Sequence, residues 1–269
     1  VYSLGKIFMT KHLFRRDFLK LGGAALFAGA LGVYAPRVLA DETEDVQVQI
    51  FTHGRRDQAQ VALSYDDCHL VTKLQKLESM LRARPEMKIT FFPTGEALLS
   101  TNQKDSGIWQ RLLEGGHEIG SHTFNHVNPE VRSTADLMED YTKWLAALNH
   151  VTESRPAVRF ARPPYGSNCP TYREMCSELG LVLTLWSASW GGELALAKKN
   201  MDAVDNGDVI LMHTSTQDVD VNSPVAFELL KTRGLRAVTM SELYLASLAK
   251  EIGAGSCGVP AYRSQTCPE

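Results

Sequence analysis

The chain has 269 residues, with 28 Lys and Arg against 31 Asp and Glu, so its formal net charge is −3. This near-neutral balance, with no basic run after residue 40, excludes nucleic acid and an acidic membrane surface as expected partners. Hydrophobic residues make up 44% of the chain, which is enough for a domain of ordinary size with a full core.

Residues 1–40 have the features of an export signal. Arg15 and Arg16 precede an apolar run of about 14 residues, and Ala40 ends a stretch of small residues suited to cleavage. A membrane anchor is the alternative, but the run is shorter than the roughly 20 residues that span a bilayer. We expect a twin-arginine signal peptide, cleavage after Ala40, periplasmic or secreted location, and no stable membrane insertion afterwards.

The rest of the chain is expected to form one domain and to act as a monomer. We divide it into a lead-in at 41–57, a domain at 58–248 and a tail at 249–269. Short apolar runs alternate with amphipathic stretches throughout the domain. Strands are predicted at 61–65, 88–92, 118–121, 159–162, 181–185, 209–212 and 236–238. Helices are predicted at 71–82, 106–114, 134–150, 170–179, 194–204, 224–232 and 240–248. Seven strand–helix units in strict alternation predict a parallel sheet closed into a barrel-like α/β fold, with reactive residues at the carboxyl ends of the strands.

Two adjacent carboxylates, Asp66 and Asp67, follow the first of these strands. Like charges this close repel unless a cation or a basic side chain lies between them, although a solvated loop that caps the next helix is also compatible with the pattern. After the third strand come His122 and His126, whose spacing puts both rings on one face of a helical turn. A surface turn is the alternative there. Together, one carboxylate and two imidazoles are typical of a hydrolytic zinc site.

Further polar residues follow the same rule. Arg162 ends the fourth strand and His213 ends the sixth. Because scattered surface residues would not gather at strand ends so consistently, the sequence predicts one site at this rim.

Four ordered motifs carry a resemblance to a known family. They are Ser-Tyr-Asp-Asp at 64–67, Ser-His-Thr-Phe-Asn-His at 121–126, Arg-Pro-Pro-Tyr-Gly at 162–166 and Ile-Leu-Met-His at 210–213. In this order they resemble the polysaccharide deacetylase family, also called carbohydrate esterase family 4 or the NodB homology domain. The resemblance implies a distorted (β/α)7 barrel, in agreement with the strand count.

The resemblance also implies a role for each motif residue. Asp67, His122 and His126 would bind a divalent metal, most often Zn²⁺, with Co²⁺ or Ni²⁺ as alternatives. Asp66 would be the general base, kept charged and oriented by Arg162. The backbone N–H of Tyr165 would stabilise the oxyanion, and His213 would be the general acid.

The implied function is a metal-dependent hydrolase that removes N-acetyl groups from an extracytoplasmic polysaccharide. Peptidoglycan, a chitin-like polymer and a poly-N-acetylglucosamine-like polymer are all compatible substrates. Attack by a metal-activated water would break the amide bond, which is not a peptide bond. The alternatives are an O-acetyl esterase acting on xylan-type glycans and a non-catalytic glycan-binding domain.

The chain departs from the family pattern near the general acid. Ser189 stands near the position where the family often has an aspartate that supports the catalytic histidine, so we expect the pKa of His213 to be less supported. This expectation is the reason for the esterase alternative. Trp186 and Trp190, on either side, would line the sugar cleft or pack the rim.

Five cysteines leave the disulfide pattern open. Cys257 and Cys267 can close a loop in the tail, whereas Cys169 and Cys176 lie too far apart if a helix separates them. A bond between Cys68 and Cys169 across the mouth of the site is a further possibility. Cys68 also follows Asp67 directly, where the family commonly has glycine, and is a candidate metal ligand.

Overall fold

A computed structural model describes residues 50–254 of the chain. The strands are β1 (Ile50–Phe51), β2 (Gln60–Asp67), β3 (Thr90–Pro93), β4 (Glu118–Ile119), β5 (Phe160–Ala161), β6 (Val182–Thr184), β7 (Ala188–Ser189), β8 (Val209–His213) and β9 (Arg236–Ala237). The helices are α1 (Val71–Arg82), α2 (Gly95–Lys104), α3 (Ile108–Glu114), α4 (Thr134–Thr152), α5 (Pro170–Leu179), α6 (Leu194–Asp202), α7 (Ser223–Thr232) and α8 (Met240–Ala254). Within this part of the chain, no helix has both the length and the apolar character needed to cross a membrane.

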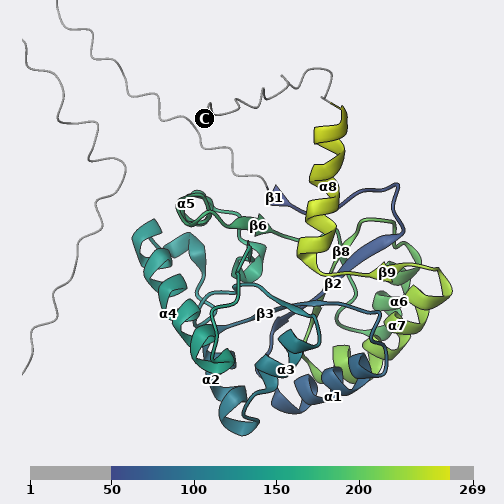
Figure 1. Cartoon of the computed structure of the whole chain (residues 1–269), viewed down its shortest axis with the longest axis horizontal. Coiled ribbons are helices and arrows are strands. Elements are labelled where there is room, and N and C mark those ends of the chain that lie inside the picture. Colours follow the sequence, from purple (N-terminus) through teal and green to yellow (C-terminus); the bar gives the residue numbers. More distant parts are fainter. Residues whose placement is uncertain (1–49, 255–269) are drawn as a thin grey trace, which may run out of the picture. The chain divides into compact units, whose positions relative to one another are not determined.

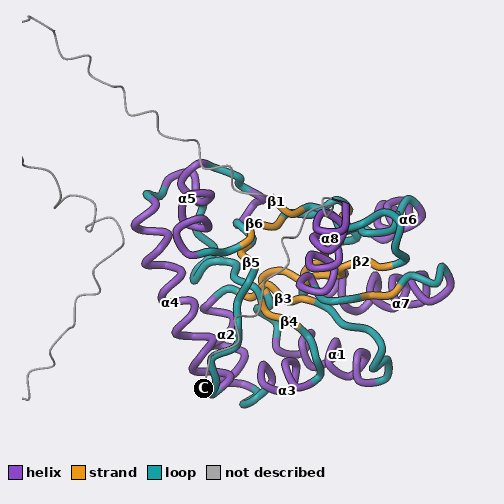
Figure 2. Tube along the Cα trace, turned by 45° about the horizontal axis from the view of Figure 1, so that its top comes forward, coloured by secondary structure: helices purple, strands orange, loops and turns teal. Residues whose placement is uncertain are grey.

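The strands pair in parallel and form the centre of the fold. One sheet has the order β4-β3-β2-β8-β7, with β9 pairing β2, and the other has the order β1-β6-β5. An isolated bridge between Ser121 and Ala161 links the two sheets. Helices such as α1, α3, α4 and α7 lie outside the strands, and Figures 1 and 2 show this arrangement from two directions. The prediction of a distorted α/β barrel is therefore confirmed.

Local sequence explains where several helices begin and end. Helix α4 starts with a capping box, in which Ser133 and Asp136 each bond the other's backbone N–H. Helix α5 has Pro170 at its first turn, where no N–H is needed, and ends at Gly180 in the left-handed conformation. The two helices pack against each other, and Asp140 within α4 bonds the loop that carries two of the site residues.

The interior is apolar and contains most of the bulky side chains. The main core cluster includes Tyr65, Phe91, Trp109 and Trp144, all of them fully buried. Trp109 and Trp144 stand at helical spacing among apolar neighbours in the sequence, which predicts core positions, and their burial confirms the prediction. A packed interior of this kind holds the strand ends at fixed positions, because a close-packed core has low compressibility.

Three elements differ from the sequence-based expectation. Helix α2 was missed: it begins with a glycine and is rich in polar residues, but Thr94 caps it by accepting a hydrogen bond from the N–H of Ala97. Strand β1 lies inside the expected lead-in and pairs with β6, and β7 is a two-residue strand beside β8. Each of the two missed strands is too short to show a periodic pattern.

Candidate active site

The two strands at the centre of the sheet bring two site residues to the same level. Asp66 is near the end of β2, and its register partner on β8 is His213. Parallel neighbours carry their carboxyl ends to one edge, so the pair lies at the rim where the sequence placed it. Asp66 is buried, whereas the side chain of His213 is 45% exposed.

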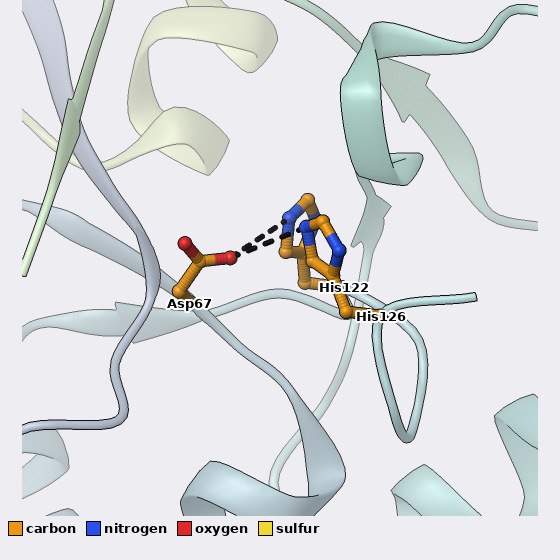
Figure 3. A group of neighbouring side chains, drawn as sticks. All are labelled: Asp67, His122 and His126. Carbon is orange, nitrogen blue, oxygen red and sulfur yellow. Dashed lines mark ion pairs between the residues drawn. The ribbon is translucent and has the colours of Figure 1, made fainter. Parts of the chain in front are cut away.

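Left-handed backbone turns form the loops of the site. Six described residues other than glycine have positive φ, and five belong to these loops: Asp67, Cys68, Thr123, His126 and Tyr165. Such conformations cost about 1–3 kcal/mol each and persist where surrounding structure imposes them. At Asp67, with φ of 67°, the chain turns out of the strand. The carboxylate thereby faces the two histidines instead of following the strand direction (Figure 3).

His122 and His126 lie on a loop, so the expectation of one helical turn was wrong. Residues 122–126 contain no helix, and Thr123 and His126 both have positive φ. Helix α4 anchors the loop, because the N–H of Phe124 donates to Oδ2 of Asp140 at 2.7 Å. The two ring centroids are 5.1 Å apart in this loop, so the rings are neighbours as expected, although no helical turn places them there.

Hydrogen bonding determines which nitrogen of His122 faces the site. Nδ1 lies 2.8 Å from the carbonyl oxygen of Arg162, which can only accept, so Nδ1 carries the proton. Burial lowers the pKa of His122 against the opposing charges of Asp66 and Asp67, so the ring is neutral. Nε2 is then unprotonated, and its lone pair is free to bind a metal ion on the side of the carboxylates, as a metal-binding histidine requires.

Asp67, His122 and His126 can together hold a metal ion. One ligand atom from each lies within 4.8 Å of the others. Oδ1 of Asp67 is 3.6 Å from Nε2 of His122 and 3.4 Å from Nε2 of His126, and Figure 3 shows all three side chains converging. The same Oδ1 atom is buried without a hydrogen-bond partner. A buried carboxylate oxygen without a hydrogen-bond partner, facing two imidazole nitrogens, fits a divalent cation, and this donor set suits zinc.

Arg162 offsets the charge repulsion between the adjacent carboxylates of Asp66 and Asp67. Its Nη1 donates to Oδ1 of Asp66 at 2.7 Å and to the hydroxyl of Ser64 at 2.8 Å, and the whole side chain is buried. Its guanidinium lies 4.1 Å from the ring centre of Phe92, which adds a cation–π contact. Oδ2 of Asp66 remains 3.9 Å from Nε2 of His122, so that oxygen faces the candidate metal site.

Tyr165 and the flanking tryptophans surround this group. Tyr165 has φ of 60° in the turn Pro164–Gly166, its ring is 4.7 Å from that of His126, and the residue is 71% exposed. Trp186 is partly buried beside Arg162, with 5.9 Å between the ring and the guanidinium. Trp190, by contrast, is fully buried in the core. The sequence left open whether these tryptophans line the cleft or pack the fold. Trp190 packs in the core, and Trp186 lies at the site.

His213 has a carboxylate partner that sequence reasoning missed. Its backbone N–H donates to Oδ2 of Asp218 at 2.8 Å, and its Nδ1 lies 3.8 Å from the same oxygen. This carboxylate raises the pKa of His213, and burial offsets part of the effect. For Asp218, burial opposes ionisation, but the contacts from His213 and the N–H of Gly192 outweigh it and lower the pKa. The expectation that His213 lacks a supporting charge was therefore wrong.

The signal for Asp218 in the sequence was weak. It lies five residues after His213, in a stretch that reads as a connection between a strand and a helix. Ser189, which drew attention instead, lines a separate hollow of about 410 Å³ together with Arg56, Ser187 and Asp208.

The described cysteines form no disulfide. Cys68, Cys169 and Cys176 are all free, so the bond suggested between Cys68 and Cys169 is wrong, while Cys169 and Cys176 are unbonded as expected. Cys68 is fully buried, burial raises its pKa well above the usual range, and its thiol donates to the carbonyl of Tyr65. It is therefore not a metal ligand. The suggested pair of Cys257 and Cys267 lies outside the described residues.

The sequence shows no motif around four further histidines, His53, His69, His117 and His150, which predicts a surface or capping role for each. One of them differs from that prediction. His117 was expected at the surface or in a cap, but it is buried against Phe91, and burial lowers its pKa to about 4. His53, His69 and His150 are exposed, as expected.

Comparison with known proteins gives one consistent result. The polysaccharide deacetylase family model matches residues 53–184. A peptidoglycan-N-acetylglucosamine deacetylase of Bacillus cereus is 29% identical over 205 residues, covering 72% of this chain and 71% of that protein. The corresponding PgdA enzyme of Listeria monocytogenes is 28% identical over 189 residues, which is 68% of this chain but only 38% of that protein.

Solved structures agree with the observed fold. A peptidoglycan N-acetylglucosamine deacetylase with 27% identity superposes with a TM-score of 0.64, covering 74% of this chain and 94% of the other. The chitin deacetylase of Colletotrichum lindemuthianum reaches a TM-score of 0.65 at 22% identity, covering 74% and 92% of the two chains, and shows the shared fold. The four ordered motifs at one rim and these matches agree, and residues 53–184 of the chain match the polysaccharide deacetylase family.

Proposed function

We propose that this chain is a metal-dependent N-deacetylase of an acetylated polysaccharide. The observation that carries the proposal is the convergence of Asp67, His122 and His126 beside the buried pair of Asp66 and Arg162. His213 completes the group, as the register partner of Asp66 on the adjacent strand. A metal position, a charged base and an acid at one rim are the parts that hydrolysis of an acyl group needs.

Each residue has a role that follows from its surroundings. When bound by Asp67, His122 and His126, a divalent cation supplies Lewis-acid chemistry: it polarises the acetyl carbonyl and acidifies water. Asp66 takes the proton from the attacking water, while Arg162 holds its other oxygen in place. General base catalysis of this kind contributes about 10²–10⁴-fold to the rate.

His213 and Tyr165 act on the other side of the reaction. An amide anion is too basic to leave unaided, so His213 protonates the departing nitrogen and acetate and a free amine result. The N–H of Tyr165, a residue in a left-handed turn whose ring lies against His126, would donate to the oxygen that becomes negatively charged.

The substrate class follows from the site and from the relatives. Peptidoglycan, a chitin-like polymer or a poly-N-acetylglucosamine-like polymer would present N-acetyl groups to this rim. Relatives with two of these substrates are named peptidoglycan-N-acetylglucosamine deacetylase and chitin deacetylase. The exposed ring of Tyr165 and the partly buried ring of Trp186 provide flat apolar surfaces of the kind that stack on sugars.

Zinc is the proposed metal, with cobalt or nickel as substitutes. The Asp-His-His donor set with one neutral tautomer already fixed suits zinc, and similar sets also accept its neighbours in the Irving–Williams order.

We also propose the organisation and location of the chain. A twin-arginine signal peptide at 1–40 and a lead-in at 41–57 precede a deacetylase domain at 58–248 and a tail at 249–269. An exported, monomeric protein would meet cell-wall or other extracytoplasmic glycans directly. Western blotting of periplasmic and culture fractions tests this: an Arg15→Lys/Arg16→Lys double variant should accumulate uncleaved in the cytoplasm.

The esterase alternative is not favoured. Its reason was a poorly supported general acid, and the carboxylate of Asp218 beside His213 removes that reason. A non-catalytic glycan-binding domain would have no use for a buried charged base paired with arginine.

Acetate release tests the proposal directly. The full chain, loaded with zinc, should release acetate from N-acetylglucosamine oligomers, and a chelator should abolish the release. Acetylated xylan serves as the comparison substrate. Release from xylan alone would make the protein an esterase, and a zinc-loaded protein that releases nothing from either would contradict the proposal.

A further inference from the structure

The strongest unassigned feature is the way Asp218 is held behind His213. Asp218 is 1% exposed and lies at the start of a π-helical turn, Asp218–Asn222, directly after the rim. Its Oδ1 accepts from the N–H of Gly192 at 2.8 Å and from the side chain of Asn222 at 3.3 Å. Its Oδ2 accepts from the N–H of His213 at 2.8 Å. A carboxylate bound from three sides has one orientation, and that orientation faces the imidazole.

The turn that carries Asp218 is itself anchored in the core. The hydroxyl of Ser223 donates to the carbonyl of Asp218 at 2.6 Å and also bonds the buried hydroxyl of Tyr65 at 2.7 Å. Tyr65 directly precedes Asp66 on β2. The strand that carries the general base therefore also anchors the turn that holds the general acid. Such buried, satisfied networks restrict side chains to one arrangement.

Gly191 explains why the carboxylate fits where it does. A Cβ atom at position 191 would lie 2.8 Å from Oδ2 and 3.5 Å from Cγ of Asp218. The carboxylate therefore fills the space that a side chain from the segment after β7 would occupy. At the next position, Gly192, a Cβ would meet nothing within 4 Å.

We propose that Asp218, in the segment after β8, is the positioning residue of the general acid His213. A carboxylate at position 191, in the segment after β7, could hold the same imidazole from nearly the same place. Gly191 is then the residue that leaves room for the carboxylate of Asp218. The inference rests on the proposed function and adds one residue to that site. It assigns no role to Ser189.

The step that Asp218 serves is the breaking of the C–N bond. Water adds its oxygen to the carbonyl carbon and its proton passes to Asp66. The C–N bond then breaks, its electron pair stays on nitrogen, and nitrogen takes the proton from Nε2 of His213. The acetyl group leaves as acetic acid, which releases its proton to solvent and becomes acetate, and the proton on Asp66 passes through solvent to restore His213. Asp218, facing Nδ1, keeps Nε2 directed outward and the ring charged until the proton is given.

Leaving-group dependence separates this role from a structural one. Asp218→Asn keeps the size of the side chain but removes its charge. The full zinc-loaded chain should lose about 100-fold in kcat on an N-acetylglucosamine oligomer, with little change in KM. Hydrolysis of p-nitrophenyl acetate should stay within about threefold, because p-nitrophenolate leaves without a proton. An equal loss on both substrates would overturn the proposal.

Transplanting the carboxylate is the sharper test. Asp218→Ala alone should be as impaired as Asp218→Asn. Adding Gly191→Asp should restore at least about tenfold of the lost kcat, because its side chain enters the vacated space and position 191 needs no left-handed backbone. Adding Gly191→Asn instead is the matched control, since it places a side chain of the same size at the same position without a charge, and it should restore nothing. Equal recovery in both double variants, or in neither, would overturn the proposal.

A titration separates failure of this inference from failure of the proposed function. The charged groups facing His213 are Asp218 from the turn after β8, with Asp66 and Asp67 from β2. NMR titration of the His213 ring, assigned by loss of its signal in His213→Gln, should give a lower pKa in Asp218→Asn than in the unmodified chain. That readout holds even if no acetylated glycan is cleaved, whereas an unchanged titration would overturn the role of Asp218 alone.

Discussion

Nη1 of Arg162 lies 2.7 Å from Oδ1 of Asp66, and both side chains are shut off from solvent at the end of the central strand. The pair joins β2 to the segment after β5, two elements 96 residues apart in the chain. It is the contact that allows a second carboxylate, Asp67, to stand directly beside the first.

Breaking this pair should destabilise the protein strongly. Arg162→Met leaves a charged, buried carboxylate without its partner, and such changes cost about 3–5 kcal/mol. Urea unfolding measures the loss. Arg236→Met is the matched control, because Arg236 pairs with Glu242 at the surface, where an ion pair contributes about 0–1 kcal/mol. If the two variants lose similar stability, Arg162 does not compensate a buried charge.

Removing a predicted metal ligand should abolish zinc binding while the fold survives. Asp67→Ala and His126→Ala each delete one of three donors, so we expect zinc affinity to fall by at least about 100-fold in calorimetric titration. Cys68→Ala is the control: it shares the positive φ of its neighbour, but its thiol is bonded to the carbonyl of Tyr65. Zinc affinity that survives Asp67→Ala, or is lost in Cys68→Ala, would place the site elsewhere.

The loop that carries the two histidines should depend on Asp140. Its Oδ2 accepts the N–H of Phe124 at 2.7 Å, midway between His122 and His126. Asp140→Ala should therefore lower zinc affinity by about tenfold without removing a ligand. Lys143→Ala is the control. It removes an exposed charge about one helical turn from Asp140, where Lys143 pairs with Glu139, and should leave zinc affinity unchanged. Equal affinities in the two variants would show that the loop holds its shape without this bond.

His117 should make stability depend on pH. Burial lowers its folded-state pKa to about 4 from the ordinary value of 6.5. As pH falls through 6.5 the unfolded chain takes up a proton that the folded protein refuses, so stability is present above this range and is lost towards pH 4. Between pH 7.5 and pH 5 this amounts to about 2 kcal/mol.

Urea unfolding of the unmodified chain and of His117→Gln at both pH values checks this prediction. Glutamine keeps a hydrogen-bond acceptor near the N–H of Ile89 but does not titrate. The difference in stability between the two pH values should shrink by about 2 kcal/mol in the variant. If it is unchanged, His117 takes up its proton as readily in the folded protein as in the unfolded chain.

The sequence by itself determined the class of fold and most of the site. Alternating strands and helices imply parallel strands, and parallel strands carry their carboxyl ends to one rim. Asp66, His122, Arg162 and His213 each lie at or just after the carboxyl end of a predicted strand, so their meeting could be inferred from the sequence. The predicted bounds of helices α1 and α5 were also correct, because apolar periodicity is a local signal and, for α5, Pro170 and Gly180 mark the two ends.

Only the tertiary structure decided how those residues face one another. The left-handed turns at Asp67 and His126 replace the expected helical geometry, because packing around the loops overrides local preference. Asp218, not a residue beside Ser189, faces His213. That choice depends on space left at Gly191 and on a hydrogen bond from Gly192, which lie 27 and 26 residues from Asp218 along the chain. Contacts between such distant positions are formed by the folded core and leave no periodic trace in the sequence.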